Sequence, residues 1–579
     1  MLLFAVFDDA GPAAEWPLRH AYLVGGDDMV LAGEVSLEQG LLRCERRQEG
    51  ACGLGIQFPV VSAAGTGKVG GGQSLLTLRT CLLPQRTQPY LLSLELARHR
   101  LMLMLNKLEE WAFFDLAADD PMMVKVEETR LAFTAALLLH RSTPPLPPPS
   151  PSGAQAGAAS PPVWFSREAD RAARHALNLA VDASEDLARK QAHMQHARRL
   201  SGETARAAAM TPPPNAITDH EARASRAAAL GTPGVLLAEM PRTGISVSPA
   251  ACTPELQAAV QATCDFLQMP MRWVDMEPTE GKYAFAKTDK WLEWAVTKAK
   301  LPVVAGPLVE LRPGAIPDFL YIWEHDYETL KEVVFEHCKT LVTRYRKVVG
   351  TWIVASGLPC GGVFKLTYEQ VIDLTRTCVL LVRKLQPSAK VVVEIAQPWG
   401  EYNAGPAQGS GQGWKAIPPT LYAELLNQLG LNIDALGVRL QMGHNLAGRS
   451  TRDPMSVSAL LDRYANLDRP LMVSALGAPS LPPPAPTGPT PKGEAATPPD
   501  PGSWRGTWSP QQQARWLTDI ATIAAGKPFV QSICWQELCD LEPGGEMPGG
   551  GLLTAPGAAK PALAAFQALH VALKDRTPL

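Results

Sequence analysis

The C-terminal part of the sequence predicts an α/β fold, a (β/α)8 TIM barrel, preceded by a small mainly-β module and long helices. Between residues 244 and 579, short apolar runs alternate seven times with longer amphipathic segments. A parallel sheet in which a helix follows each strand produces that alternation, and closure of the sheet gives a barrel. The residues before 244 lack this alternation, so we expect them to form a separate part of the fold.

The barrel elements follow in order along the chain. The seven expected strands are short and rich in aliphatic residues: Met271–Val274, Pro302–Ala305, Thr351–Ala355, Val391–Ile395, Ala435–Arg439, Leu471–Ser474 and Phe529–Ile533. The helices expected between them are Asp289–Ala299, Tyr327–Val348, Tyr368–Leu385, Pro419–Leu429, Val457–Leu467 and Pro510–Ala524. Parallel barrels bind ligands on the loops that follow the strands, so the site is expected at the strand ends.

The N-terminal part predicts β-strands first and helices afterwards. Short strands are expected at Met29–Leu31, Gly53–Phe58 and Leu75–Leu78, separated by turn residues. Two amphipathic helices are expected at Tyr90–Trp111 and Ser166–Leu200, burying their apolar faces against each other, against the barrel or in a dimer. The glycine-rich run 65–72 lacks the Gly-Lys-Ser/Thr ending of a phosphate-binding loop, so we interpret it as a hairpin loop.

Length, charge and cysteine spacing argue against several classes of protein, including nucleic-acid-binding, membrane and zinc-binding proteins. A chain of 579 residues exceeds one domain, and 54 Lys and Arg against 57 Asp and Glu leave a net charge of -3, which argues against nucleic-acid and membrane-surface binding. The sequence has no apolar run of transmembrane length, and its first residues have no basic region of a signal peptide, so a cytoplasmic protein is expected. The ten cysteines are too widely spaced to suggest a zinc site, and no metal or cofactor is expected.

Proline marks the boundaries of the parts. The chain has 52 prolines, and they concentrate in residues 142–162 and 479–501. Segments of this composition do not fold alone. We therefore divide the chain into a β module with an amphipathic helix (1–141), a Pro-rich linker (142–162), a helical connector (163–243) and a barrel (244–579) that contains a Pro-rich insertion (478–503).

Several segments of the barrel resemble glycoside hydrolase family 10, whose members are mainly endo-β-1,4-xylanases on a TIM barrel. The most specific is Glu277–Phe285 with Asp289, which is similar to the family's E-P-x-x-G-x-[YF]-x-F-x-x-x-D segment. Further resemblances follow in the family's order at Gly306–Val309, Ile316–Phe319, Arg344–Val354, Ile433–Val438 and Lys560–Ala562. The resemblance covers about residues 245–575 and implies a retaining glycosidase that acts on β-1,4-glycans such as xylan.

The sequence departs from the family where the resemblance places its catalytic groups. Family members use two glutamates, an acid/base and a nucleophile, about 5 Å apart. Gly357 stands at the acid/base position and Ala475 at the nucleophile position. Pro307 replaces a family histidine, and Arg439–Gln441 replaces a Q-x-H segment. The family mechanism is therefore not expected to operate.

Other acidic residues near the ends of predicted strands are candidate replacements. Glu394 lies near the end of the strand Val391–Ile395, Glu401 lies on the loop that follows it, and Glu537 lies after Phe529–Ile533. Acids beside tryptophans suit sugar binding, because carboxylates accept hydroxyl hydrogen bonds and indole faces stack on sugar rings. The expected substrate-binding set is Trp399, Glu394, Glu401, Arg439, Gln441, His444, Trp535 and Glu537. The alternatives are that Glu394 forms a structural ion pair with Arg439, and that His444 is an ordinary loop histidine.

Tryptophans on the loops have two interpretations. Trp399, Trp414, Trp504, Trp508 and Trp535 lie after strands, where a ligand would explain them. Trp504 and Trp508 follow the second Pro-rich tract, so they are equally well explained as anchors that hold that segment on the barrel. Trp273 and Trp352 are expected in the core.

Three functions remain open from the sequence. The first is a barrel that binds an oligo- or polysaccharide with hydrolysis lost or strongly reduced. The second is an active glycosidase with relocated carboxylates, and the third is a structural or interaction protein. Self-association through the N-terminal helices is an open alternative for the partner.

Overall fold

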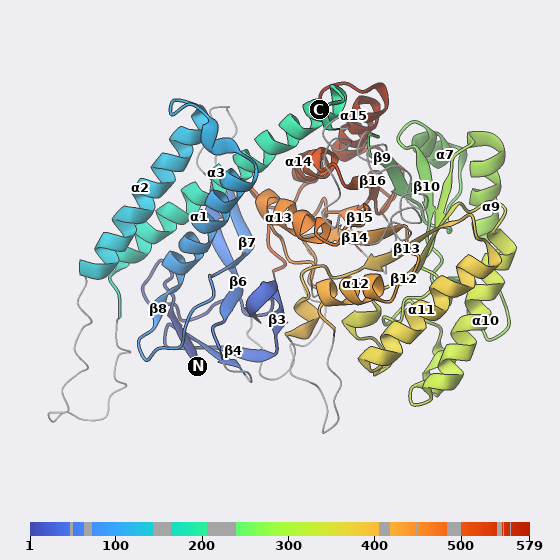
Figure 1. Cartoon of the computed structure of the whole chain (residues 1–579), viewed down its shortest axis with the longest axis horizontal. Helices are drawn as coiled ribbons and strands as arrows, with labels where there is room; N and C mark the ends of the chain where they lie inside the picture. The colour runs from blue at the N-terminus through green and yellow to red at the C-terminus, as the bar shows by residue number, and fades with distance from the viewer. Residues whose placement is uncertain are drawn as a thin grey trace, which may run out of the picture.

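A computed structural model shows the fold of the chain (Figure 1). It describes residues 1–46, 50–62, 72–142, 164–204, 239–404, 417–446, 448–482, 500–540, 547, 549–555 and 557–579. The glycine-rich run up to Gly71, Trp414 and nearly all of both Pro-rich tracts lie outside these residues.

The C-terminal part is a closed barrel of eight parallel strands, as predicted. In chain order the strands are β9 (Arg242–Ser246), β10 (Phe266–Met269), β11 (Val303–Ala305), β12 (Thr351–Ser356), β13 (Lys390–Ile395), β14 (Ala435–Gln441), β15 (Leu471–Gly477) and β16 (Val530–Trp535). Each strand pairs with the next along the chain, and β16 pairs with β9 to close the barrel.

At least one α-helix follows each strand of the barrel. These helices are α7 (Pro254–Gln261), α9 (Ala286–Trp294, continued by a π-turn at Ala295–Ala299), α10 (Tyr327–Tyr345), α11 (Tyr368–Leu385), α12 (Pro419–Gln428), α13 (Pro454–Ala465), α14 (Pro510–Gly526) and α15 (Pro561–Asp575). Short helices η4 (Asp318–Trp323), η5 (Leu358–Cys360) and η6 (Glu401–Asn403) follow β11, β12 and β13.

Two details at the start of the barrel differ from the prediction. The expected strand Met271–Val274 is wrong, because β10 ends at Met269 and a short helix, α8 (Trp273–Met276), begins after Pro270. Strand β9 was not among the seven expected strands. It has a single large apolar residue, Ile245, and its burial comes from pairing with β10 and β16 on closure.

Closure also explains a glycine in β9. A layer of inward side chains fills the barrel: Phe266, Val304, Ile353, Val392, Ala435, Met472 and Cys534. A Cβ atom on Gly244 would lie 2.1 Å from the ring of Phe266. The aromatic ring therefore occupies the space that an eighth side chain would need, and β9 has no side chain there.

The N-terminal module contains two four-stranded sheets, ordered β4-β5-β1-β8 and β3-β2-β6-β7. Its strands are β1 (Leu2–Ala5), β2 (Tyr22–Val24), β3 (Val30–Leu31), β4 (Gly33–Glu38), β5 (Leu41–Arg46), β6 (Gly53–Val61), β7 (Gln73–Arg79) and β8 (Tyr90–Leu91), with the turn η1 (Gly26–Asp28) before β3. The mainly-β prediction is confirmed, and the antiparallel pair β6 and β7 flanks the glycine-rich run.

Three long helices follow the sheets: α1 (Leu92–Glu110), α2 (Pro121–Ser142) and α3 (Arg167–Leu200). The sequence prediction identified α1 and α3 and missed α2. Helices α1 and α2 both pack on α3, and α3 packs on α13 and α14 of the barrel (Figure 1). Two of the three expected ways to bury these helices, against each other and against the barrel, are therefore observed. No helix among the described residues is both long and apolar enough to cross a membrane.

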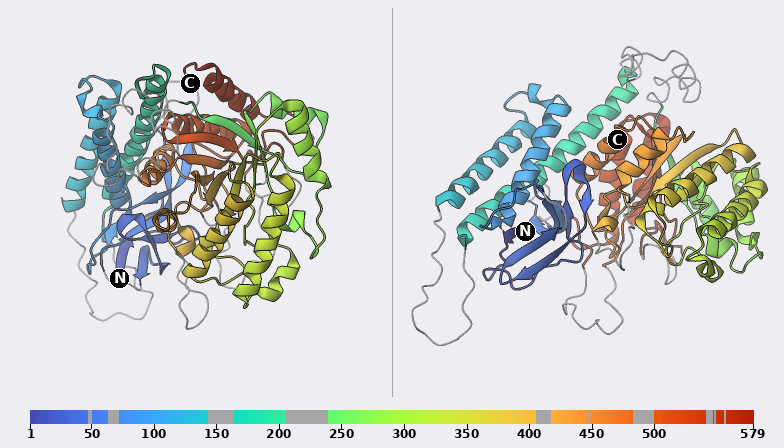
Figure 2. Two further views of the ribbon diagram at one scale, coloured as in Figure 1. Left: turned by 45° about the vertical axis from the view of Figure 1, so that its right-hand side comes forward. Right: turned by 60° about the horizontal axis from the view of Figure 1, so that its bottom comes forward.

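The N-terminal module packs against the loops at the carboxyl ends of β14 and β15 (Figure 2). Strand β7 is the edge of its sheet and pairs there with barrel segments. The Thr77 N–H donates to the Thr451 carbonyl (2.8 Å), and Leu75 and Ser503 exchange two backbone hydrogen bonds of 2.9 and 3.1 Å. The Thr77 hydroxyl also bonds that of Ser450 (2.8 Å). The exposed edge of the module is thus completed by the barrel.

A buried ion pair reinforces this interface. Arg100 of α1 donates to both carboxylate oxygens of Asp453, at 2.7 and 2.6 Å. Asp453 lies at the start of α13, where it also accepts the Ser456 N–H at 3.1 Å. Both charged side chains are almost fully excluded from solvent. A bidentate pair of this kind gives a specific geometry, and each partner depends on the other for compensation of its charge.

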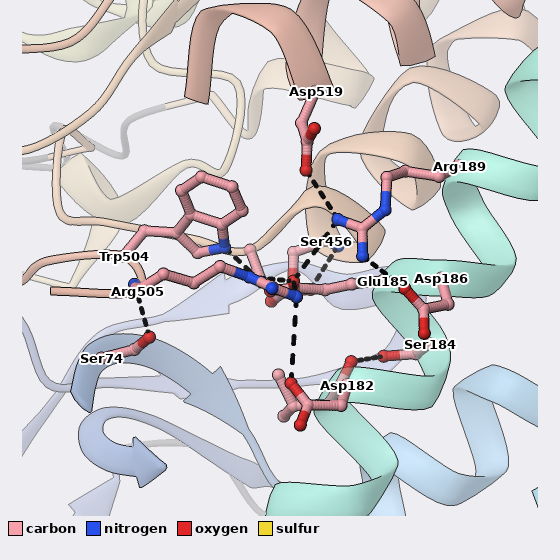
Figure 3. Close-up of polar contacts among 12 residues, drawn as sticks. Ser74, Asp182, Ser184, Glu185, Asp186, Arg189, Ser456, Trp504, Arg505 and Asp519 are labelled. Atoms are coloured by element: carbon pink, nitrogen blue, oxygen red, sulfur yellow. Dashed lines mark hydrogen bonds and ion pairs between the residues drawn. The ribbon is translucent and has the colours of Figure 1, made fainter. Parts of the chain in front are cut away.

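A second polar cluster joins α3 to the segment after the Pro-rich insertion (Figure 3). Glu185 accepts the indole N–H of Trp504 (2.9 Å) and a guanidinium N–H of Arg505 (2.6 Å). The Arg505 backbone N–H donates to the Ser74 hydroxyl of β7 at 2.8 Å. Trp504 and Trp508 are both buried, and Trp508 donates to the Gly502 carbonyl. These contacts agree with the interpretation of Trp504 and Trp508 as anchors.

Replacing Arg100 should reveal the strength of the interface. We expect Arg100→Met to lower the free energy of unfolding by about 3–5 kcal/mol, because Asp453 then keeps a buried charge without its cation. Urea unfolding followed by circular dichroism measures the loss. The control is Arg130→Met on α2, whose pair with Glu127 is exposed on both sides and should contribute little to stability. Equal losses in the two variants would contradict this account.

Glu185 should make stability depend on pH. Burial, opposed by the charge of Arg505, raises the pKa of Glu185 to about 7. The folded protein therefore holds this proton more tightly than the unfolded chain, so the stabilisation is complete below the unfolded pKa of about 4.3 and is lost as pH rises through about 7. Between pH 5 and pH 8 the wild type should lose about 2–3 kcal/mol more than Glu185→Gln. Unfolding of both proteins at the two pH values tests this, and parallel pH profiles would refute it.

Candidate functional site

The family resemblance predicts the two glutamate positions at Gly357 and Ala475, which lie at the carboxyl ends of β12 and β15. Gly357 directly follows β12, and its φ of 62° is in the left-handed region. A Cβ atom there would lie 3.1 Å from the Cβ of Ala396. Ala475 lies in β15, in register with Arg439 of β14, and is buried. Neither position offers a proton donor or a nucleophile.

Glu394 lies inside the barrel between these two positions. Its Oε1 accepts the Ser474 hydroxyl at 2.6 Å, and its Oε2 accepts the Ser356 hydroxyl at 2.5 Å. The Arg439 Nε–H donates to the same Oε2 at 2.8 Å. The side chain is 1% exposed. The ion pair with Arg439, one of the two interpretations made from the sequence, is therefore present, and both carboxylate oxygens have protein partners.

The ion pair extends to a third strand end through Glu310. The Arg439 guanidinium lies 3.6 Å from Glu310 Oε1, and the Arg312 Nε–H donates to the same oxygen at 2.8 Å. Glu310 follows β11 and is buried. The sequence analysis missed this acid. The available signal was its place four residues after Gly306, in the loop that follows the predicted strand Pro302–Ala305.

Glu401 belongs to a separate set of contacts on the loop after β13. It forms an ion pair with Arg452, and the Gly448 N–H donates to its other oxygen at 2.5 Å. The Arg452 guanidinium stacks over the Trp399 ring, with 4.2 Å to the ring centroid. Arg452 also lies 3.4 Å from the Tyr22 hydroxyl of the N-terminal module. Glu401 and Trp399 are both buried, so they contribute to the contact between module and barrel.

The remaining candidates lie around the ends of β14 and β16. Trp535 is fully buried and donates its indole N–H to the Gly550 carbonyl at 3.0 Å. Glu537 is 8% exposed. His444 is half-buried, and its Nδ1 accepts the Leu446 N–H at 3.2 Å. The amide of Gln441 is 2% exposed and has no hydrogen-bond partner within the described part of the chain.

The candidate site residues therefore do not form one site but belong to several separate groups of contacts. Glu394 and Arg439 are brought together inside the barrel, Trp399 and Glu401 join Arg452, and Trp535 packs under the last loop. Trp273 and Trp352 are core residues, as expected. Among the described residues, no group of three or more His, Cys, Asp and Glu side chains is arranged to hold a metal.

Glu277, the glutamate of the E-P-x-x-G segment, forms hydrogen bonds that stabilise the local fold. Glu277 accepts the indole N–H of Trp273 at 2.9 Å and the backbone N–H of Gly281 at 2.8 Å. His337 of α10 lies 3.0 Å from its Oε2 and stacks on Trp273, with 4.0 Å between the ring centroids. The segment thus connects α8, the following turn and α10, which gives its residues a packing role at this end of the barrel.

Comparison with known families agrees with this geometry. Residues 242–357, from the start of β9 to the glycine after β12, match the glycosyl hydrolase family 10 model. The first half of the barrel is therefore similar to family 10. The match covers the first four strands and ends at Gly357.

The individual proteins that the chain resembles are distant in sequence. Over 222 residues it is 24% identical to an endo-1,4-beta-xylanase of Agaricus bisporus, which is 37% of this chain and 61% of the relative. The chain thus spans about three fifths of the curated relative that it matches. Similar solved structures include xylanase 10B of Thermotoga maritima, at 16% identity and a TM-score of 0.43, covering 59% of this chain and 97% of that one. Xylanase 10B of Thermotoga petrophila RKU-1 in complex with xylobiose has 16% identity and a TM-score of 0.42, with coverages of 60% and 97%.

The backbone at Gly357 should resist any side chain. We expect Gly357→Ala to lower the free energy of unfolding by about 1–2 kcal/mol for the left-handed backbone, with a further loss from the close contact with Ala396. The control is Gly430→Ala, which has a similar φ of 64° but nothing within 4 Å of the added Cβ. Thermal unfolding should rank wild type, Gly430→Ala and Gly357→Ala in decreasing stability. A neutral Gly357→Ala would contradict the expectation.

Proposed function

We propose that this chain interacts with a β-linked oligosaccharide through a family 10-type barrel and carries out little or no retaining hydrolysis. The observation that supports the loss of hydrolysis is the pair Gly357 and Ala475 at the family glutamate positions. Retaining hydrolysis needs one carboxyl group to protonate the leaving oxygen and a second to attack the anomeric carbon. Neither side chain can do so.

The acid nearest to these positions does not replace them. Glu394 accepts hydrogen bonds from Ser356, Ser474 and Arg439 and is excluded from solvent. A general acid must reach the leaving oxygen, and a nucleophile must reach the anomeric carbon within bonding range. An oligosaccharide would have to displace three partners of Glu394 to contact it. Glu401 is similarly engaged by Arg452 and the Gly448 N–H.

A sugar-binding role is supported by two other facts. The chain is similar to an endo-1,4-beta-xylanase, and its barrel matches family 10 up to the end of the fourth strand. The Gln441 amide at the end of β14 is buried and has no partner among the described residues. Buried amides are usually hydrogen-bonded, and sugar hydroxyls both donate to and accept from such a group.

Titration calorimetry with xylo- and cello-oligosaccharides, beside a reducing-sugar assay, tests the proposal. We expect weak binding and product formation near the assay's blank, because Glu394 and Glu401 are both engaged by protein partners. Gln441→Leu should weaken the binding at least about tenfold if its amide contacts the sugar. The control is Gln257→Leu, on the outer helix α7, which should bind as the wild type does.

A further experiment tests whether the barrel lacks only the two catalytic carboxylates or has also lost the cleft that binds the sugar. Ala475→Glu alone, and together with Gly357→Glu, returns the two family carboxylates. If the cleft still holds the sugar in register, the double variant should regain measurable hydrolysis, provided that its fold survives the strain at position 357. Robust turnover by the wild type that survives Glu401→Gln and Glu537→Gln would refute the proposal.

A second candidate function rests on the docking of the N-terminal module. Strand β7 covers loops after β14 and β15, and the tryptophans Trp399, Trp504 and Trp535 are buried by protein. This arrangement favours a structural or interaction role for the barrel. Absence of binding to every oligosaccharide in the titration would favour this candidate.

A further inference from the structure

A cavity of about 80 Å³ lies between the N-terminal module and the barrel. It is formed by β2, β7 and α1 on one side and by α13 with the loop residues Trp399 and Arg452 on the other. Four of its lining residues are arginines: Arg79, Arg100, Arg452 and Arg463. We call it the arginine cavity. It is separate from Glu394 and the strand-end positions discussed above.

The arginine cavity has more cations than anions. Among the described residues, its four arginines form ion pairs with three carboxylates. Two of these, Asp453 with Arg100 and Glu401 with Arg452, belong to buried pairs whose acids do not line the cavity. Arg79 and Arg463 share the third, Asp28: Arg79 lies 3.1 Å from its Oδ1, and Arg463 contacts its Oδ2.

Two neutral side chains in the cavity wall, Tyr22 and His99, have lowered pKa values. Although burial alone would raise it, the charges of Arg452 and Arg79 lower the pKa of the Tyr22 phenol. Burial, followed by the charges of Arg79 and Arg100, lowers the pKa of His99 to about 3. His99 is therefore uncharged at neutral pH and does not add to the cations. The lowered pKa of Tyr22, with the smaller contribution of Arg79 and Arg100 to that of His99, indicates a site that favours a negative charge.

Asp28 is the built-in anion and is the most weakly held of the three. Its side chain is 42% exposed, whereas those of Asp453 and Glu401 are nearly or fully buried. It belongs to the turn η1, in which both Asp27 and Asp28 have positive φ, 54° and 57°. This backbone is unfavourable for residues with a Cβ atom, so the turn is held partly by the two arginines. An incoming anion would compete with Asp28 for Arg79 and Arg463.

We propose that the arginine cavity binds a phosphate-class anion, either free phosphate or the phosphate group of a monoester. A cavity needs about 10–15 Å³ to hold one water molecule. At about 80 Å³, the arginine cavity can hold several waters or one tetrahedral oxyanion. Guanidinium groups bind phosphate oxygens through paired N–H donors, and here they approach from both β7 and α13. A ligand there would bridge the module and the barrel. The proposal does not depend on glycan binding.

Calorimetric titration of the full chain with inorganic phosphate at constant ionic strength and neutral pH tests the proposal. Wild type should bind phosphate. Asp28→Asn should bind it about tenfold more tightly, because the competing carboxylate is gone and the arginines stay. Arg79→Gln with Arg463→Gln should weaken it by at least about tenfold. The control Arg43→Gln removes a surface arginine paired with Glu38 and should leave the affinity unchanged.

Other ligands in the same experiment distinguish the sources of the anion. Equal binding of phosphate and sulfate with none of glucose 6-phosphate would identify a free oxyanion as the ligand, and tighter binding of glucose 6-phosphate would identify a monoester. Tighter binding of acetate than of phosphate would overturn the proposal. So would the absence of phosphate binding in both wild type and Asp28→Asn. If the double arginine variant fails to fold, as judged by circular dichroism, the Asp28→Asn result decides.

Discussion

The loop Arg449–Asp453, between β14 and α13, determines how the two halves of the molecule meet. Ser450 and Thr451 bond β7, Arg452 pairs with Glu401 and contacts Tyr22, and Asp453 pairs with Arg100. These polar groups are buried, and a buried polar or charged group without a partner is costly. The module is therefore held at the carboxyl end of the sixth barrel strand, the end at which parallel barrels bind their ligands.

Buried charged groups inside the barrel also have partners of opposite charge. Glu394, Arg439 and Glu310 come from three different strand ends, and Arg312 supplies the second cation that balances the two acids. A retaining glycosidase keeps two carboxyl groups available to its substrate. In this barrel the acids near the family positions are instead engaged with arginines and serines, so the polar groups of the mouth stabilise the fold. The arginine cavity between the module and the barrel differs, because four arginines and a single acid, Asp28, line it among the residues that the structure describes.

Much of the fold follows from local patterns in the sequence. The aliphatic runs Val391–Ile395 and Leu471–Ser474 are strands, and the amphipathic segment Tyr368–Leu385 is a helix with the predicted bounds. The failures have local causes. Strand β9 has too few apolar residues to be recognised, and α2 was missed although it is a regular helix. Its apolar residues are not confined to one face: Val124, Leu131 and Leu138 are exposed. A clear amphipathic period is what identifies a helix from sequence.

The sequence by itself determined the parallel barrel and the mainly-β module, and its family resemblance predicts that Gly357 and Ala475 replace both family glutamates. Only the tertiary structure decided which charges pair and where the module docks. Arg100 and Asp453 are 353 positions apart, and Tyr22 and Arg452 are 430 apart. Periodicity records which face of an element is buried, since that depends on near neighbours. The choice of partner for a buried charge depends on distances set by the whole fold, which no local pattern contains.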